Sequence, residues 1–297
     1  MAEQYRLLAP AKINLYLRII GRRPDGYHEL RTLMQKLALF DILTFTLLPD
    51  KGVRLNCRQN GLPEDEKNIV YQAARLFFEH TGKKGQGIEI TLEKNIPVAA
   101  GLGGGSSDAA AALLALNHLF ETGCTVDELA ALGVRLGADV PLFIYDFPAA
   151  WATGIGEQLT PAIPLTAYVI VLANPGISVS TKWAYDTFAL TSEKNIFNLY
   201  SSQKENQDSS ADVPFVVRPF SPEELANDLE RVTSEKFSVI NMIKEEMVAG
   251  GAAGTLMSGS GPTVFGLFPK ENPEQAKACC RKLMHEYDQV YLVNPLT

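Results

Sequence analysis

Apolar and polar residues alternate along the first part of the chain. The alternation runs through 12–20, 33–48 and 53–57, and Pro-Asp-Gly at 24–26 interrupts it as a turn. A two-residue period places every second side chain on one face of a β-strand. The pattern therefore predicts a strand-rich beginning.

The period then lengthens to that of a helix. Helical spacing is found at 68–82, which ends at Gly82, at 106–120 and at 125–137, with a strand pattern at 87–94 between the first two. Apolar residues three and four positions apart lie on one side of a helix, and glycine commonly ends one. Two short strands are predicted after these helices, at 140–145 and 149–154.

Glycine and proline near 155–165 indicate a passage into a second unit, so we predict domains at 1–158 and 159–297. The second domain is predicted to contain strands at 168–176, 263–268 and 289–294, and helices at 181–190, 222–233, 236–248 and from Asn272 onward. The polar stretch 201–213 is predicted to be a surface loop. Strands and helices in mixed order favour the α+β class.

Composition restricts the possible partners. The net charge is -7, so the surface as a whole does not attract nucleic acid, and an anionic ligand must be met by a local basic cluster. Four cysteines without a C-x-x-C pair indicate neither a zinc site nor a disulfide framework, which fits a reducing cytoplasm. With no signal sequence and no apolar stretch of membrane-spanning length, no membrane association is expected.

A glycine-rich segment, 101–107, directly precedes the helix predicted at 106–120. It lacks the Gly-Lys pair of the P-loop, and it fails the dinucleotide-binding pattern because Ser106 replaces the last glycine. Backbone N–H groups in such a loop, together with the start of a helix, still form a site suited to phosphate. Ser106 or Ser107 is the predicted N-cap, with Asp108 in the first turn. A merely flexible turn before a capped helix explains the same residues.

A second Gly/Ser turn, 258–262, precedes the strand predicted at 263–268. Close approach of its backbone to a ligand or to the first loop would explain its glycines, and so would a plain β-turn. Two loops of this kind in one chain favour a phosphate-binding function.

Polar candidates occur near the N-terminus and before 140. Lys12 stands in a strand pattern, where it either solubilises an edge or faces a polar site. Positive charge, stacking and hydrogen-bonding capacity then gather around one turn, in Arg22, Arg23, Tyr27 and His28. Asp139 lies between a predicted helix and an apolar run, either as a turn residue or as a carboxylate directed into a cleft.

The chain resembles the GHMP small-molecule kinases. The central motif of that family, P-x-x-x-G-L-G-S-S-A-A, is similar to the sequence at 97–113, lengthened here by two glycines. Further similarity lies, in order along the chain, at 9–19, 25–30, 136–143 and 257–268. The resemblance extends from about Ala9 to the C-terminus and is weakest across 190–250.

The resemblance implies a two-domain α+β fold. Its N-terminal domain would contain a left-handed βαβ unit, its C-terminal domain would be ferredoxin-like, and the active site would lie in the cleft between them. The motifs match one branch of the family best. That branch implies a bacterial cytoplasmic enzyme that uses ATP and Mg²⁺ to phosphorylate the 2-hydroxyl of the methylerythritol part of a small cytidine-diphosphate substrate. A monomer or weak homodimer is expected.

The resemblance also assigns roles to residues. Asp139 would be the catalytic carboxylate and Lys12 its cationic partner. Asn68 and Lys94 would lie near the adenine. The ATP phosphates would be surrounded by Pro97, Val98, Ala99, Ala100, Gly101, Leu102, Gly103, Gly104, Gly105, Ser106 and Ser107. Some relatives are richer in glycine where this chain has Ala99 and Ala100.

For the acceptor, the resemblance implies that Tyr27 and His28 recognise the cytosine and that Tyr185 stacks on its other face. Asn14 would contact the methylerythritol part. No residue is assigned to the metal. Two other functions stay open: a different acceptor alcohol, as in mevalonate-branch or sugar kinases, or a ligand sensor without catalysis. The presence of both Lys12 and Asp139 favours an enzyme over a sensor.

Overall fold

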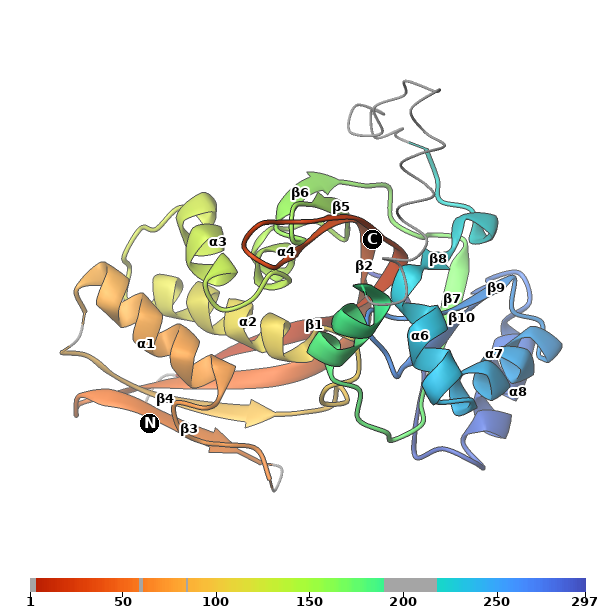
Figure 1. The fold of residues 1–297 in the computed structure, drawn as a ribbon. Coiled ribbons are helices and arrows are strands. Elements are labelled where there is room, and N and C mark those ends of the chain that lie inside the picture. The colour runs from red at the N-terminus through yellow and green to blue at the C-terminus, as the bar shows by residue number, and fades with distance from the viewer. Residues whose placement is uncertain (1–3, 59–60, 84, 190–217) are drawn as a thin grey trace.

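The computed structural model describes residues 4–58, 61–83, 85–189 and 218–297. Figure 1 shows two units side by side, each a β-sheet covered by helices. Helices and strands follow each other in mixed order, so the α+β class predicted from the sequence is confirmed. Within the described ranges, no helix is both long and apolar enough to span a membrane.

The first sheet is built mainly from the N-terminal half. Its strands are β1 (Gln4–Arg22), β2 (His28–Leu48), β3 (Gly52–Cys57), β4 (Gly87–Glu93), β5 (Ala149–Thr153), β6 (Gln158–Pro161) and β8 (Ala226–Asn227). The order is β3-β4-β2-β1-β8, and β5 pairs with both β2 and β6. The long strands β1 and β2 are antiparallel, with Lys12 directly opposite Lys36.

Helices α1 (Ile69–Thr81) and α2 (Gly104–Leu119) lie against this sheet, and α3 (Val126–Val134) and α4 (Val140–Ile144) pack on α2 and on each other. Their shared core contains Phe45 of β2 and Phe77 of α1, both fully buried. The run 109–112 of α2 is alanine throughout and buried, so this helix packs closely on its neighbours. Helix α1 ends at Gly82 as predicted, with φ of 70°.

The second sheet contains β7 (Tyr168–Asn174), β9 (Gly254–Met257), β10 (Val264–Pro269) and β11 (Gln289–Val293). Its order is β11-β7-β10-β9 with antiparallel neighbours, which is the arrangement of the ferredoxin-like fold predicted for this domain. One face carries α6 (Asp228–Lys236), α7 (Val239–Ala249) and α8 (Pro273–Leu283). Residues 181–189 are also helical, and Ala184 joins this core.

The two sheets share an inter-sheet core. It contains Ala11, Ile13, Leu15, Leu33, Leu37, Ile96, Ala100, Leu102, Leu165, Ile170, Leu172, Leu256, Phe265, Leu267 and Val293. Alternation along β1 directs Ile13 into this core and Lys12 toward the helices of the first unit. The domain boundary at 158/159 stays a prediction, because β8 of the second half completes the first sheet by pairing with β1.

Two elements predicted from the sequence are wrong. The strand predicted at 140–145 is instead the short helix α4 (Val140–Ile144), because a brief apolar run has no period that separates a buried strand from a buried helix. The helix predicted at 222–233 begins only at Asp228, after a 3₁₀ turn at Pro222–Glu224 and strand β8. Strands β6 and β9 were not predicted. The loop predicted at 201–213 lies outside the described residues.

Candidate active site

The glycine-rich loop connects β4 to α2 in a backbone conformation that glycine favours. Gly101 and Gly103 have φ of 77° and 70°, in the left-handed region. A Cβ on Gly101 would lie 2.2 Å from the carbonyl oxygen of Ser258, and one on Gly103 would lie 2.8 Å from Cγ of Lys12. These glycines are therefore required by close packing as well as by backbone conformation.

Helix α2 begins earlier than predicted. Its N-cap is Gly103, which offers no side-chain cap, so the prediction of Ser106 or Ser107 as the cap is wrong. Both serines lie inside the helix, and Asp108 is buried in its second turn rather than standing in the first. The left-handed Gly103 starts the helix by itself. The N–H groups of the first turn, left without a side-chain acceptor, can bind an anion.

The two Gly/Ser loops meet, which supports one of the two explanations left open for the second loop. The Ser258 hydroxyl donates to the carbonyl oxygen of Gly101 at 2.9 Å, and the backbone N–H of Asn14 donates to that hydroxyl at 3.3 Å. The N–H of Lys12 donates to the carbonyl of Leu102 at 2.9 Å. Three motifs that are distant in sequence are thus joined at one place.

At this junction lies the pair Lys12 and Asp139. The Lys12 Nζ is 3.2 Å from Oδ2 of Asp139 and donates to Oδ1 of Asn14 at 2.6 Å. Lys12 is buried, whereas the Asp139 side chain is 34% exposed. Asp139 occupies the N-cap position of α4 without capping it, so its carboxylate is directed to Lys12 and to solvent. The structure therefore brings both predicted catalytic residues together.

Asn14 is held in one orientation. Its Nδ2 donates to the Thr32 hydroxyl at 2.9 Å, and that hydroxyl donates to the carbonyl of Tyr16 at 2.6 Å. Asn14 Oδ1 consequently faces the Lys12 ammonium, which leaves the ammonium between an amide oxygen and a carboxylate. Thr32 was not among the residues singled out from the sequence, since a threonine in a strand carries no signal of its own.

The residues predicted to recognise the cytosine lie together. The rings of His28 and Tyr185 stack with centroids 5.2 Å apart and an angle of 26° between their planes, and Tyr27 is exposed. A base between the two rings would require them to separate, so that part of the prediction stays untested. The Nε2 of His28 is buried without a hydrogen-bond partner. Burial, with the charge of Arg22, lowers the pKa of His28, which favours the neutral imidazole.

Burial, reinforced by the negative charge of Asp139, raises the pKa of Tyr185. That electrostatic coupling indicates that the His28–Tyr185 pair lies toward the Lys12–Asp139 pair, although the two come from different segments of the chain.

Asn68 and Lys94 have structural partners. Asn68 caps α1 by accepting from the N–H of Val70 at 2.9 Å, and it donates to the carbonyl of Pro63. Lys94 forms buried ion pairs with Asp41 and with Asp108, the latter at 2.7 Å. These contacts do not test the prediction that both residues lie near the adenine.

The cluster of Lys94, Asp41 and Asp108 supports the glycine-rich loop. Asp41 also accepts from the N–H groups of Asn95 and Ile96 where β4 leads into the loop. Burial acts to lower the pKa of Lys94, but the two carboxylates outweigh it and raise that pKa. Burial raises the pKa of Asp108 to about 7. Sequence reasoning missed Asp41, although a charged residue in a largely apolar strand must find a partner.

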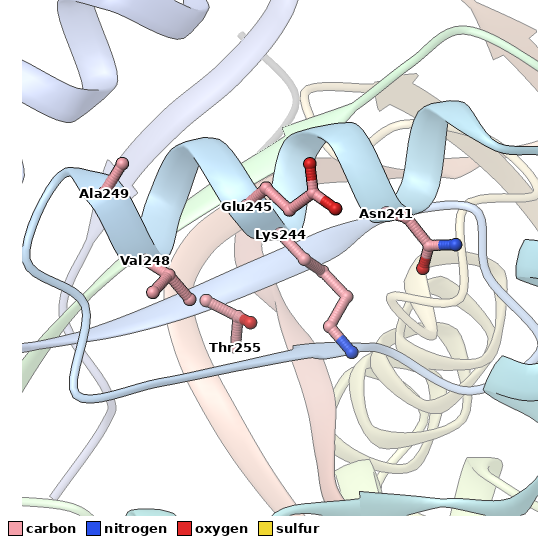
Figure 2. Close-up of a pocket in the computed structure, with 6 residues that line it drawn as sticks. All are labelled: Asn241, Lys244, Glu245, Val248, Ala249 and Thr255. Atoms are coloured by element: carbon pink, nitrogen blue, oxygen red, sulfur yellow. The ribbon is translucent and has the colours of Figure 1, made fainter.

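A groove of about 470 Å³ lies elsewhere, along α7 and β9 (Figure 2). Its lining residues are Asn241, Lys244, Glu245, Val248, Ala249 and Thr255. None of them belongs to the site predicted from the sequence. Lys244 is paired with Glu230.

Comparison with known proteins assigns the fold to a family. Residues 68–147 match the model of the GHMP kinases N terminal domain, and residues 221–286 match the model of the GHMP kinases C terminal domain. A protein of Geobacter metallireducens named 4-diphosphocytidyl-2-C-methyl-D-erythritol kinase is 47% identical over 95% of this chain and 95% of its own. One of the same name from Syntrophotalea carbinolica is 46% identical over 91% and 92%.

Solved structures agree with this family assignment. A crystal structure of 4-(cytidine 5'-diphospho)-2C-methyl-D-erythritol kinase superposes with a TM-score of 0.76 and 34% identity, over 99% of this chain and 100% of that one. Homoserine kinase from Cytophaga hutchinsonii gives a TM-score of 0.70 at 21% identity, covering 100% and 95% of the two chains, which shows a common fold alone.

Proposed function

The chain belongs to the GHMP kinase family, and we propose that it is an ATP-dependent kinase acting on 4-diphosphocytidyl-2-C-methyl-D-erythritol in non-mevalonate isoprenoid biosynthesis. It transfers the γ-phosphate of ATP to the 2-hydroxyl of the acceptor and releases ADP. The structural observation that carries the proposal is the contact of Lys12 with the partly exposed Asp139 beside the glycine-rich loop. The relatives of the same name supply the acceptor.

Asp139 and Lys12 are the proposed catalytic residues. An alcohol is too weak an acid to be ionised in advance, so Asp139 orients the hydroxyl and accepts its proton as the new oxygen–phosphorus bond forms. The bond from the γ-phosphorus to the bridging oxygen of ADP breaks at the same time. The Lys12 ammonium, 3.2 Å from the Asp139 carboxylate, offsets phosphate charge. Asn14 Oδ1 accepts from the same ammonium and so helps to hold it in place.

The nucleotide is proposed to bind at residues 97–107, with Asn68 and Lys94 toward the adenine. The N–H groups at the start of α2 and the positive end of that helix offset phosphate charge in a chain of net charge -7. Gly101 and Gly103 let this loop pack closely on Ser258 and Lys12, where a Cβ would clash. The tight junction with Ser258 keeps the loop in this shape.

Mg²⁺ is part of the proposal. The described residues contain no cluster of three His, Cys, Asp or Glu side chains that could enclose a metal. Mg²⁺ does not need such a cluster, because in phosphate-transferring sites it is held largely by phosphate oxygens and water with one or two side chains. The Ser106 hydroxyl, in the first turn of α2 and close to Gly137 before Asp139, would be one oxygen ligand. The metal would neutralise phosphate charge during transfer.

The acceptor is proposed to lie against Tyr27, His28, Tyr185 and Asn14. The unpartnered Nε2 of His28 supports this, since a buried polar atom without a partner is costly unless a ligand satisfies it. A neutral imidazole can donate to or accept from a pyrimidine edge. Tyr27 is exposed and free to pack on the base. We further propose that the protein acts in the bacterial cytoplasm as a monomer or weak homodimer and does not bind nucleic acid.

ADP release, measured with the purified protein, ATP and Mg²⁺, tests the function. We expect release that depends on 4-diphosphocytidyl-2-C-methyl-D-erythritol and does not occur with mevalonate, homoserine or galactose. Equal release with one of those alcohols would replace the proposed acceptor. Nucleotide binding with no turnover on any acceptor would favour a ligand sensor instead.

A further inference from the structure

Another buried lysine, Lys36, lies opposite Lys12, the proposed catalytic lysine. Lys36 of β2 is the cross-strand partner of Lys12 of β1, so both side chains leave the same face of the sheet. Lys36 is 7% exposed. A buried ammonium is unfavourable unless it makes strong contacts, and nothing in the proposed phosphate transfer uses this one.

The contacts of Lys36 lead to α4. Its Nζ donates to the carbonyl oxygen of Tyr145 at 2.8 Å, and Tyr145 is the C-cap of that helix. Lys12 pairs with Asp139, which occupies the N-cap position at the other end. Two lysines opposite each other on neighbouring strands therefore hold the two ends of one five-residue helix.

We propose that Lys36 is a positioning residue for the phosphate transfer: it fixes the C-terminal end of α4 and thereby sets the place of Asp139 relative to Lys12. A helix of this length cannot bend to absorb a shift, so a movement at Tyr145 is carried to Asp139. The backbone of Lys36 is fixed as well, because its N–H donates to Pro148 and its carbonyl accepts from Leu296. The inference rests on the proposed kinase function.

The protonation of Lys36 gives this arrangement a measurable signature. Burial lowers the pKa of Lys36 to about 8, and the charge of Asp146 only partly offsets that effect. Across the strand pair lies Lys12 on β1, and Lys36 contacts the backbone of Tyr145, whose hydroxyl donates to Asp127 of α3. Pro295 and Leu296, which lie beside β2, are uncharged. Loss of the Lys36 proton removes the positive charge that holds the Tyr145 carbonyl.

The test compares kcat at saturating substrates from pH 6.5 to 9.5 in the natural protein, Lys36→Met and Lys36→Arg. We expect the natural kcat to fall above about pH 8. The kcat of Lys36→Met should be lowered roughly tenfold to hundredfold at pH 7.5, as for a misplaced catalytic group. It should also no longer fall above about pH 8. Lys36→Arg, which stays charged, should keep most of kcat and lose the decline too. KM for both substrates should change less than about threefold, since Lys36 touches neither in this arrangement.

Exposed Lys270→Met is the matched control and should retain the natural profile. Natural kcat in Lys36→Met, or an unchanged alkaline decline in Lys36→Arg, would overturn the inference while leaving the kinase assignment intact. A second readout does not depend on turnover. The crystal structure of Lys36→Met, or of Lys36→Arg if the first does not fold, is compared with that of the natural protein. Lys36→Met should lengthen the 3.2 Å separation of Lys12 and Asp139, and Lys36→Arg should preserve it; the opposite result in either variant contradicts the inference.

Discussion

Two clusters of lysine and aspartate lie in the first domain, and they differ in their access to solvent. In one, Lys12 is paired with Asp139, whose side chain is 34% exposed. In the other, Lys94 is enclosed with Asp41 and Asp108, whose side chains are 0% and 3% exposed. Both touch the glycine-rich segment, since Gly103 packs on Lys12 and Gly104 on Lys94.

The difference in exposure indicates different roles for the two clusters, one in catalysis and one in stabilising the fold. A carboxylate that reaches solvent can bind and deprotonate a substrate, and water can stabilise it when its partner is lost. Carboxylates sealed from solvent depend on their ammonium, since an unpaired buried charge is strongly destabilising. We call Lys12 and Asp139 the open pair, and Lys94, Asp41 and Asp108 the closed cluster. The open pair is therefore expected to govern turnover and the closed cluster to govern stability.

Asp139→Asn should produce the largest effect. The amide keeps the shape of the side chain but cannot accept the proton, so kcat should fall by about 10²–10⁴-fold while the melting temperature stays near that of the natural protein. Steady-state ADP release and thermal unfolding measure the two quantities. Exposed Asp288→Asn is the control. Turnover within a few-fold of the natural enzyme would remove Asp139 as the base.

The same substitution at the two lysines tests the comparison most directly. Lys94→Met leaves two buried carboxylates without their ammonium partner and should lower the free energy of unfolding by about 3–5 kcal/mol. Lys12→Met leaves a carboxylate that water reaches and one buried acceptor, Asn14 Oδ1, without its donor, so the loss should be smaller, about 1–3 kcal/mol, although activity disappears. Urea unfolding at pH 7.5 measures both variants. Equal destabilisation would show that exposure does not divide the two clusters.

Asp108→Asn should change how stability depends on pH. The pKa of Asp108 is raised from 3.8 to about 7, so the folded protein holds this proton over a range where the unfolded chain has released it. The group's contribution to stability is therefore full below about pH 4 and is lost as pH rises to about 7, with a slope of at most about 1.4 kcal/mol per pH unit. The variant should lack this slope. Parallel curves for both proteins, from urea unfolding at pH 4.5 to 7.5, would contradict the raised pKa.

Ser258→Ala should have the smallest effect. It removes the bond to Gly101 and the acceptor for the N–H of Asn14, which should cost about 1 kcal/mol of stability. Because the loop loses one anchor, KM for ATP should rise severalfold while kcat changes little. Exposed Ser238→Ala, whose hydroxyl caps nothing, is the matched variant. An effect on acceptor KM alone would indicate that the loops serve the other substrate.

Periodicity predicted most elements of the fold, and its failures have a physical cause. Long elements such as β2 and α1 were found because their period repeats several times. Residues 140–145 were mistaken for a strand because so short a run does not complete two helical turns. The start of α2 was misplaced because the left-handed Gly103, not a serine, begins the helix, and sequence does not display φ.

The sequence predicted the open pair more completely than the closed cluster. Lys12 and Asp139 were identified by resemblance to a family, and the structure places them in contact. Lys94 was also named, but its partner Asp41 was not, because Asp41 is 53 residues away and meets it only when β2 pairs with β4. Ion pairs across a sheet follow from strand order and register, which one sequence does not specify.

The inter-sheet core has a consequence for dividing the molecule. Cutting the chain after β6 would uncover Ile13 and Leu33 and strip β1 of its partner β8. Neither fragment would then possess a complete interior, and each would expose enough apolar surface to self-associate. Separate expression of the halves would therefore disturb β1 itself, which carries Lys12, proposed to be catalytic, on the opposite side from Ile13.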